Sequence, residues 1–197
     1  MRGFVTIVTG VTLALLLAGC SAIVGGGKAP QTYDLSAPTE FGNIGGSSAQ
    51  ILVPVATAVA SLDTERIVVR PSGSEITYLG DAQWSDRLPK LLQARLVESF
   101  ERSGRVGRVG RPGEGLVADY QILTEIRAFE AEPSTGLARS EISVRIVNDR
   151  NGRIVASKTF VNEAVLAGSG HGSIISGLDA AMREALHDIV AWTLARI

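Results

Sequence analysis

Few side chains in this chain of 197 residues could do covalent or metal chemistry, because it contains one cysteine, Cys20, and two histidines, His171 and His187. Metal sites need clustered His, Cys and carboxylate ligands, and a nucleophilic triad needs a base that a third group orients. His171 lies in a glycine-rich stretch, with no second histidine, cysteine or paired carboxylates near it in the sequence. His187 lies on or near the polar side of an expected helix. We therefore expect no cofactor, no metal site and no catalytic centre, and a lipid-cleaving enzyme is the weakest interpretation.

The chemistry of Cys20 follows from its position at the end of an apolar run. Residues 4–18 carry no charge and follow Arg2, which is the layout of a signal peptide, and the run is too short to span a bilayer. Its ending, Leu17-Ala18-Gly19-Cys20, resembles a bacterial lipobox. We expect residues 1–19 to be a lipoprotein signal peptide and Cys20 to carry diacylglyceryl and N-acyl groups, palmitate among them. The alternatives are an ordinary secretory signal with a chance cysteine, and a free thiol buried in the fold.

A lipidated Cys20 would place the rest of the chain on a membrane surface, since two or three acyl chains hold a protein there essentially permanently. Residues 20–30 include Gly25-Gly26-Gly27 and are expected to form a flexible tether. Residues 31–197 are expected to form a single domain. Ser21 follows the cysteine, and by resemblance to enteric lipoprotein sorting a residue other than aspartate favours the outer membrane, facing the periplasm. The 19 basic and 20 acidic residues exclude the basic excess that nucleic-acid binding needs.

The hydrophobic pattern of the domain predicts an α+β fold. Leu88, Leu92, Leu96 and Phe100 recur every four residues and indicate a helix with one buried face. The expected helices are 85–103, with Ser85 and Asp86 as its N-cap, and 173–195. The expected strands are 32–36, 50–56, 65–70, 75–79, one short strand within 104–115, 119–130, 138–147 and 153–161, with a loop at 41–48 and a turn at 80–84. We expect an antiparallel or mixed sheet with both main helices on one face.

Two groups of residues are candidates for contact with a partner. Trp84, Asp86 and Arg87 lie where a strand is expected to give way to the first helix, and exposed Trp and Arg dominate many interfaces. Trp84 has an alternative interpretation as a buried anchor between sheet and helix. The second group is Arg105, Arg108 and Arg111, spaced three residues apart among glycines. They either surround a short strand without further role or contact lipid phosphates or an acidic partner.

Several segments, taken in order, resemble the ABC-type transport auxiliary lipoprotein family. Besides the lipobox they are Tyr33-Asp34-Leu35, Val53-Pro54-Val55-Ala56, the residues 62–70 (LDTERIVVR), Glu75-Ile76-Thr77-Tyr78 and the residues 84–89 (WSDRLP). The resemblance covers nearly the whole chain. One departure flanks Leu62-Asp63, where many members have an aromatic residue and a proline and this chain has Ser61 and Thr64-Glu65-Arg66.

The resemblance implies an accessory role in lipid transport. Members are similar to the lipoprotein of the paraquat-inducible system and work with ABC transporters that carry an MCE (mammalian cell entry) subunit. By this resemblance we expect the chain to dock the periplasmic MCE assembly at the outer membrane, to support lipid trafficking and envelope integrity, and to form homo-oligomers. The alternative function is an assembly or plug lipoprotein for an outer-membrane protein or lipopolysaccharide complex.

Overall fold

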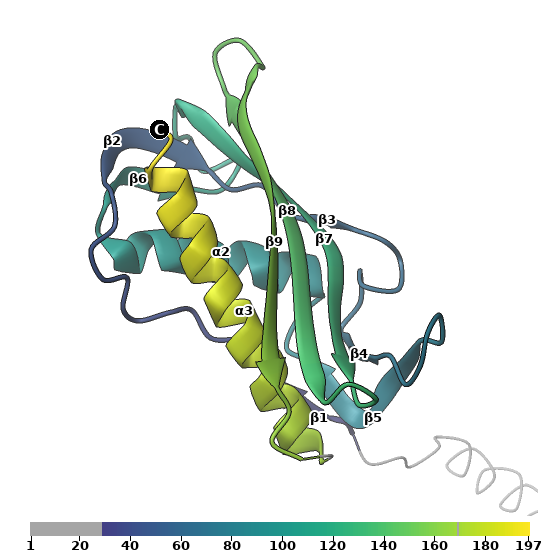
Figure 1. Ribbon diagram of the computed structural model, residues 1–197. Helices are drawn as coiled ribbons and strands as arrows, with labels where there is room; N and C mark the ends of the chain where they lie inside the picture. The colour runs from purple at the N-terminus through teal and green to yellow at the C-terminus, as the bar shows by residue number, and fades with distance from the viewer. Residues whose placement is uncertain (1–28, 169) are drawn as a thin grey trace, which may run out of the picture.

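The computed structural model describes residues 29–168 and 170–197. Cys20, the expected signal peptide and most of the expected tether lie outside these residues. The described chain forms a mixed sheet of nine strands and two helices (Figure 1), which confirms the α+β class. The strands are β1 (Gln31–Tyr33), β2 (Ser47–Leu52), β3 (Thr57–Ala58), β4 (Arg66–Val69), β5 (Thr77–Trp84), β6 (Val106–Gly110), β7 (Tyr120–Glu132), β8 (Leu137–Asn148) and β9 (Ile154–Val165), and the helices are α2 (Leu88–Ser103) and α3 (His171–Leu194).

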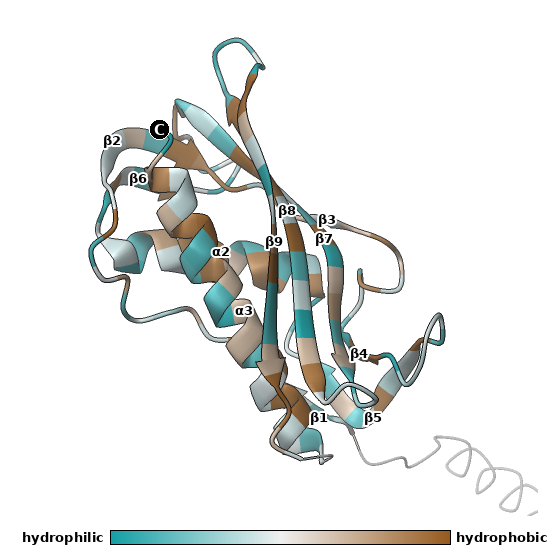
Figure 2. Cartoon of the chain, viewed as in Figure 1, coloured by the Kyte–Doolittle hydropathy of each residue, from teal (hydrophilic) through white to brown (hydrophobic). Residues whose placement is uncertain are grey.

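The predicted meander of three long strands is confirmed as β7, β8 and β9. Their alternating residues bury one side of the sheet, with Ile122 paired to Ile146 and Ile126 paired to Ile142 across β7 and β8. Figure 2 shows apolar and polar residues alternating along these strands, the pattern of a sheet that packs on one face and meets water on the other. Gly136 and Gly152 occupy the two connecting turns with positive φ.

Strand β7 also joins the remaining strands to the meander. Strands β2, β3 and β4 each pair parallel with a different stretch of β7, β5 and β1 continue the sheet beyond β4, and β6 continues it beyond β2. The sheet order along this path is β1-β5-β4-β7-β2-β6. Strands from the two halves of the chain therefore meet in one sheet.

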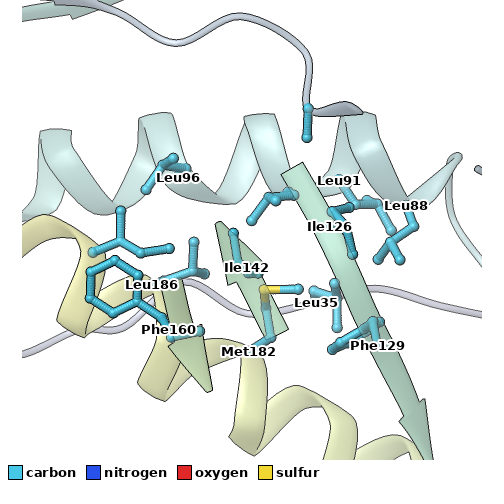
Figure 3. Packing of buried hydrophobic residues seen from close by; sticks show 14 of the residues in the cluster. Leu35, Leu88, Leu91, Leu96, Ile126, Phe129, Ile142, Phe160, Met182 and Leu186 are labelled. Atoms are coloured by element: carbon cyan, nitrogen blue, oxygen red, sulfur yellow. The ribbon is translucent and has the colours of Figure 1, made fainter. Parts of the chain in front are cut away.

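Both helices lie on the same face of the sheet and share one core. The predicted stripe on α2 is buried, and α3 packs on β7, β8 and β9 through residues that include Met182 and Leu186. Figure 3 shows side chains from both helices meeting Ile126, Phe129 and Ile142 of the sheet. Neither described helix combines the length and the apolar composition that crossing a bilayer requires.

Several expected boundaries differ from the structure. The turn expected at 80–84 is strand, because Asp81 takes a positive φ of 50° at an irregularity in the β4–β5 pairing and β5 continues to Trp84. The strand expected at 50–56 stops at Leu52, since Pro54 has no N–H to donate, and pairing with β7 resumes at β3. The last helix begins two residues earlier than expected, at His171.

The first helix begins at Leu88, later than Ser85, because the residues before it belong to the sheet. The Trp84 N–H donates to the Glu65 carbonyl at 2.7 Å, and the Ser85 N–H donates to the Tyr33 carbonyl at 2.7 Å. The helix tolerates Pro89 in its first turn, where a missing N–H costs nothing. It ends, as predicted, before Gly104, which has a left-handed conformation with φ of 59°.

Candidate functional site

Trp84 is a core residue that positions the start of α2. Its side chain is 1% exposed and packs on Phe129 with ring centroids 5.8 Å apart. The structure therefore supports the buried-anchor interpretation, and the inclusion of Trp84 among the contact residues is corrected: a side chain with no exposed surface cannot meet a partner. Its large apolar area joins β5 to β7 beneath the helix start.

Asp86 and Arg87, in contrast, lie at the surface next to this anchor. The Asp86 Oδ1 accepts the Arg87 N–H at 2.7 Å and lies 3.6 Å from Lys90 Nζ. The Arg87 guanidinium pairs with the Asp63 carboxylate. Exposed pairs of this kind add little stability, so their charges are available to a partner at small cost to the fold. We call Asp63, Asp86, Arg87 and Lys90 the junction cluster.

Arg108 lies in β6, the short strand expected among the glycines, and Arg105 and Arg111 flank its two ends. All three are exposed. Strand β6 is the last in the sheet and pairs parallel with β2. Gly107 is required for this pairing, because a Cβ there would lie 2.2 Å from the Ser48 carbonyl oxygen. We call the three arginines the basic edge.

One member of the basic edge is tied to a neighbouring turn. The Glu114 carboxylate accepts the Arg111 N–H at 2.7 Å and lies 3.3 Å from its Nη1. The backbone hydrogen bond, with smaller help from the guanidinium, lowers the pKa of Glu114, so this carboxylate keeps its charge. Arg111 is therefore partly neutralised, and Arg105 and Arg108 carry most of the edge's positive character.

The structure does not bring the two predicted groups together. The junction cluster lies at the N-terminal end of α2 and the basic edge follows its C-terminal end, and a helix of 16 residues is about 24 Å long. A single partner would have to cover the length of α2 to contact both.

Between them lies a groove that no sequence motif marks. It is bounded by residues 34–40, α2 and α3 and has a volume of about 840 Å³. Arg95 pairs with Asp34 at 2.9 Å and also with Glu98, and Glu98 pairs with Arg102 at 2.5 Å. Arg102 Nη1 donates to the Ala37 carbonyl at 3.0 Å. The spacing of Arg95, Glu98 and Arg102 on one helix face was the available signal. These contacts hold the segment 34–40 against α2.

Helix α3 holds the same segment from the other side. The Ser36 N–H donates to the Asp179 Oδ1 at 2.6 Å, and Asp179 also lies 3.6 Å from the Arg183 guanidinium. His187 stacks on Phe41 with ring centroids 5.6 Å apart and an interplanar angle of 12°. His187 therefore packs against the segment that follows β1, and its ring lines the groove.

The two histidines lie at different places on α3. His171 is an exposed residue at the start of α3, far along that helix from His187. Within residues 29–168 and 170–197, no group of three or more His, Cys, Asp or Glu side chains is arranged to hold a metal ion.

The open face of the sheet carries a further ionic network near the β7–β8 turn. Arg70 binds Glu130 through two hydrogen bonds of 2.7 and 2.8 Å, and the Glu130 side chain is only 7% exposed. Arg139 binds Glu141 at 2.6 Å and lies 4.0 Å from Glu163. Hydrogen bonds to these carboxylates raise the pKa of both guanidiniums. The network joins β4, β7, β8 and β9 on the face that the helices leave uncovered.

Comparison with known proteins gives consistent results over this whole domain. Residues 33–190 match the family described as ABC-type transport auxiliary lipoprotein component. An uncharacterised protein of Bradyrhizobium diazoefficiens is 36% identical over 187 residues, which are 92% of this chain and 50% of that protein. The chain thus spans about half the length of this curated relative.

Two solved structures have folds similar to that of this chain. A crystal structure of a protein from Xanthomonas campestris is 25% identical and has a TM-score of 0.74, covering 85% of this chain and 94% of that one. A crystal structure of an uncharacterised protein is 14% identical with a TM-score of 0.68, covering 84% of this chain and 99% of that one. The second likeness concerns the fold alone.

Proposed function

Because the chain belongs to the family of ABC-type transport auxiliary lipoprotein components, we propose that it is the membrane-anchored accessory subunit of a lipid transporter that carries an MCE subunit. It docks the periplasmic part of that transporter at the outer membrane and supports lipid trafficking and envelope integrity. The observation that carries the proposal is the family match over residues 33–190. The matched range contains strands β2–β9, helix α2 and most of α3, together with the last residue of β1. The role is one of binding, not of catalysis.

The proposed docking surface consists of the exposed charges at the two ends of α2. The junction cluster supplies Asp86 and Arg87, and the basic edge supplies Arg105, Arg108 and Arg111. Trp84 contributes by fixing the helix start and not by contact. Exposed arginines on rigid elements suit this role, since the guanidinium makes directed bonds with carboxylates and phosphates.

The proposed anchor is Cys20, with residues 1–19 as signal peptide and 20–30 as tether. The described domain begins next to β1, which lies near the N-terminal end of α3 and the β7–β8 turn (Figure 1). A tether of ten residues reaches about 16–19 Å on average. This end of the domain would therefore face the membrane, and the C-terminal end of α3 and β6 would face the periplasm.

Membrane fractionation of the wild type and of Cys20→Ala tests the anchor and its address. The proposal predicts wild-type protein in the outer membrane and a Cys20→Ala form released from it. A wild-type chain in the inner membrane, or a location that does not depend on Cys20, would contradict it.

Co-purification tests the docking surface. Reversing two charges of the basic edge, in Arg105→Glu with Arg108→Glu, is expected to reduce recovery of the MCE subunit by about tenfold or more. Arg153→Glu, an exposed arginine in the β8–β9 turn, is the matched control and should leave recovery unchanged. Equal loss in both variants would show a general charge effect, and recovery of a β-barrel protein alone would favour the assembly or plug function.

A further inference from the structure

Strand β6 forms an open edge of the sheet beside a groove. Within the described part of the chain, β6 pairs with β2 alone and lies at the margin of the sheet (Figure 1). All five residues of β6 line a groove of about 410 Å³, whose other walls are the C-terminal end of α2 and the turn that contains Glu114 and Leu116. We call it the edge groove. A segment that entered it would meet the backbone of β6.

The backbone of Val109 is directed toward this open edge. The Val53 N–H donates to the Gly110 carbonyl at 2.9 Å, and the register from Arg108 to Gly110 is regular, so both of these residues direct their backbone groups toward β2. Backbone groups of successive residues alternate between the two sides of a strand. The N–H and C=O of Val109 therefore have no strand partner among the described residues.

The next backbone donor on this side, the Arg111 N–H, is bound by a carboxylate. The Gly110 carbonyl faces β2, and a trans peptide directs its C=O and N–H to opposite sides, so the Arg111 N–H faces the open edge. There it donates to Glu114 Oε2 at 2.7 Å. A carboxylate of the chain itself thus occupies the place that a carbonyl oxygen of an added strand would take. This contact indicates that an acidic group suits this end of the edge.

The side chains around the edge differ between the two faces of the sheet. On the helix side, the edge groove has an apolar lining of Phe100, Val106, Val109 and Leu116, and the valines pack against the core. Arg108 is exposed and, as the neighbour of Val109 in a regular strand, lies on the opposite face. An added strand would therefore meet apolar groups on one face and a guanidinium on the other.

We propose that β6 receives an extended segment of a partner protein as an added strand, and that this segment alternates apolar and acidic residues. The identity of the partner, the MCE subunit, rests on the proposed function, and the inference adds how the basic edge holds it. The backbone of the segment bonds to Val109 and, in place of Glu114, to the Arg111 N–H. Its apolar side chains enter the edge groove near Phe100, and its carboxylates face Arg108.

The charges of the basic edge favour an acidic partner over a second copy of this chain. Arg111 is paired with Glu114, whereas the exposed Arg105 and Arg108 form no ion pair within residues 29–168 and 170–197. Two β6 strands side by side would bring the arginines of both copies together, and like charges on neighbouring strands are destabilising. Glu101 is exposed on the α2 wall of the edge groove, so the carboxylates of the segment belong on the face that carries Arg108.

Fluorescence anisotropy of a labelled peptide of alternating valine and glutamate, added to the detergent-extracted full chain, tests the strand pairing. Val109→Pro removes an N–H that points away from β2, so the β2–β6 pairing survives while the peptide loses a donor. We expect Val109→Pro to bind the peptide about tenfold more weakly than the parent, and Val109→Thr, which keeps the N–H, to bind like the parent. Circular dichroism establishes that each variant is folded.

Three results of this assay would overturn the proposal. One is that the parent does not bind the peptide. Another is that a folded Val109→Pro chain binds as well as Val109→Thr, because charge alone would then hold the peptide. The third is that a peptide of alternating valine and lysine binds the parent as well as the acidic peptide does.

Replacement of Glu114 tests the same edge in the opposite direction. Glu114→Ala frees the Arg111 N–H and should bind the acidic peptide about threefold more tightly than Glu114→Gln. Glu114→Gln is the matched control, since it loses the same charge but keeps a side-chain oxygen that accepts this N–H. Equal binding by the two variants would mean that only the charge matters and would contradict the proposal.

Amide exchange separates this inference from the proposed function. In the complex of the full chain with the subunit that co-purifies from the membrane, the Val109 amide should exchange about tenfold more slowly than in the chain alone, as read by mass spectrometry at single residues. Recovery of an MCE subunit without this protection would overturn the strand pairing and leave the docking role in place. Protection by a different protein would support the pairing and refute the proposed partner. Protection already present in the chain alone would mean that a second copy fills the edge, and would overturn the proposal.

Discussion

Replacing Trp84 by alanine tests whether the start of α2 is set by a buried anchor. Trp84 is 1% exposed and is the largest of the fully buried side chains, in contact with Phe129. Truncating a buried tryptophan to alanine costs about 3–5 kcal/mol in lost transfer energy and residual cavity. In a domain of this size, each kcal/mol lowers the melting temperature by about 2–4 °C. We therefore expect Trp84→Ala to melt about 6–20 °C below the parent.

Thermal unfolding followed by circular dichroism measures this effect, with Arg87→Ala as the control three residues away. The Arg87 side chain is 51% exposed and pairs with a partly exposed carboxylate, so its removal should cost only about 0–1 kcal/mol. Trp84→Phe, which keeps a ring against Phe129, should fall between the two. A Trp84→Ala protein that melts with the parent but no longer recovers the transporter would refute the anchor role and restore Trp84 as a contact residue.

Two further predictions follow from local geometry. Gly107→Ala should lower the free energy of unfolding by about 1–3 kcal/mol, because its Cβ would overlap the Ser48 carbonyl and the strands must shift. Chemical denaturation measures this change. Gly172→Ala is the control and should not destabilise the chain, since nothing lies within 4 Å of a Cβ at that position. The Gln50 N–H, with help from Arg150, lowers the pKa of Asp119, so the stability from this carboxylate is present above pH about 3.9 and is lost as pH falls through its lowered pKa. Asp119→Asn should therefore be less stable than the parent at neutral pH, with a difference that shrinks below pH 4 in melting curves. A difference that grew on acidification would contradict this assignment.

The sequence predicted the elements whose residues pack periodically. The four-residue spacing from Leu88 to Phe100 and the alternation along β7–β9 reflect burial on one side, which survives in the structure because packing on one core imposes it. Boundaries were less predictable where local signals compete with sheet pairing. Asp81 and its neighbour Gly80 have the composition of a turn, yet pairing with β4 carries the strand through them.

The candidate site was predictable only in part, because contacts between distant segments leave no local pattern. The arginines of the basic edge were visible as a repeat. The groove was not, since Asp34 meets Arg95 and Ser36 meets Asp179 only after β1 joins the sheet beside β5. Trp84 had two interpretations because its burial depends on Phe129, which lies 45 positions later in the chain.

The most direct test of the proposed function is to identify what the basic edge touches in the cell envelope. A photo-crosslinking amino acid at position 108 in the full chain, followed by mass spectrometry of the crosslinked product, reports the neighbour of this edge, and the same probe at position 153 is the control. The docking role predicts an MCE subunit of an ABC transporter crosslinked from position 108 and not from position 153. A β-barrel protein as the product from position 108, or the same products from both positions, would contradict it.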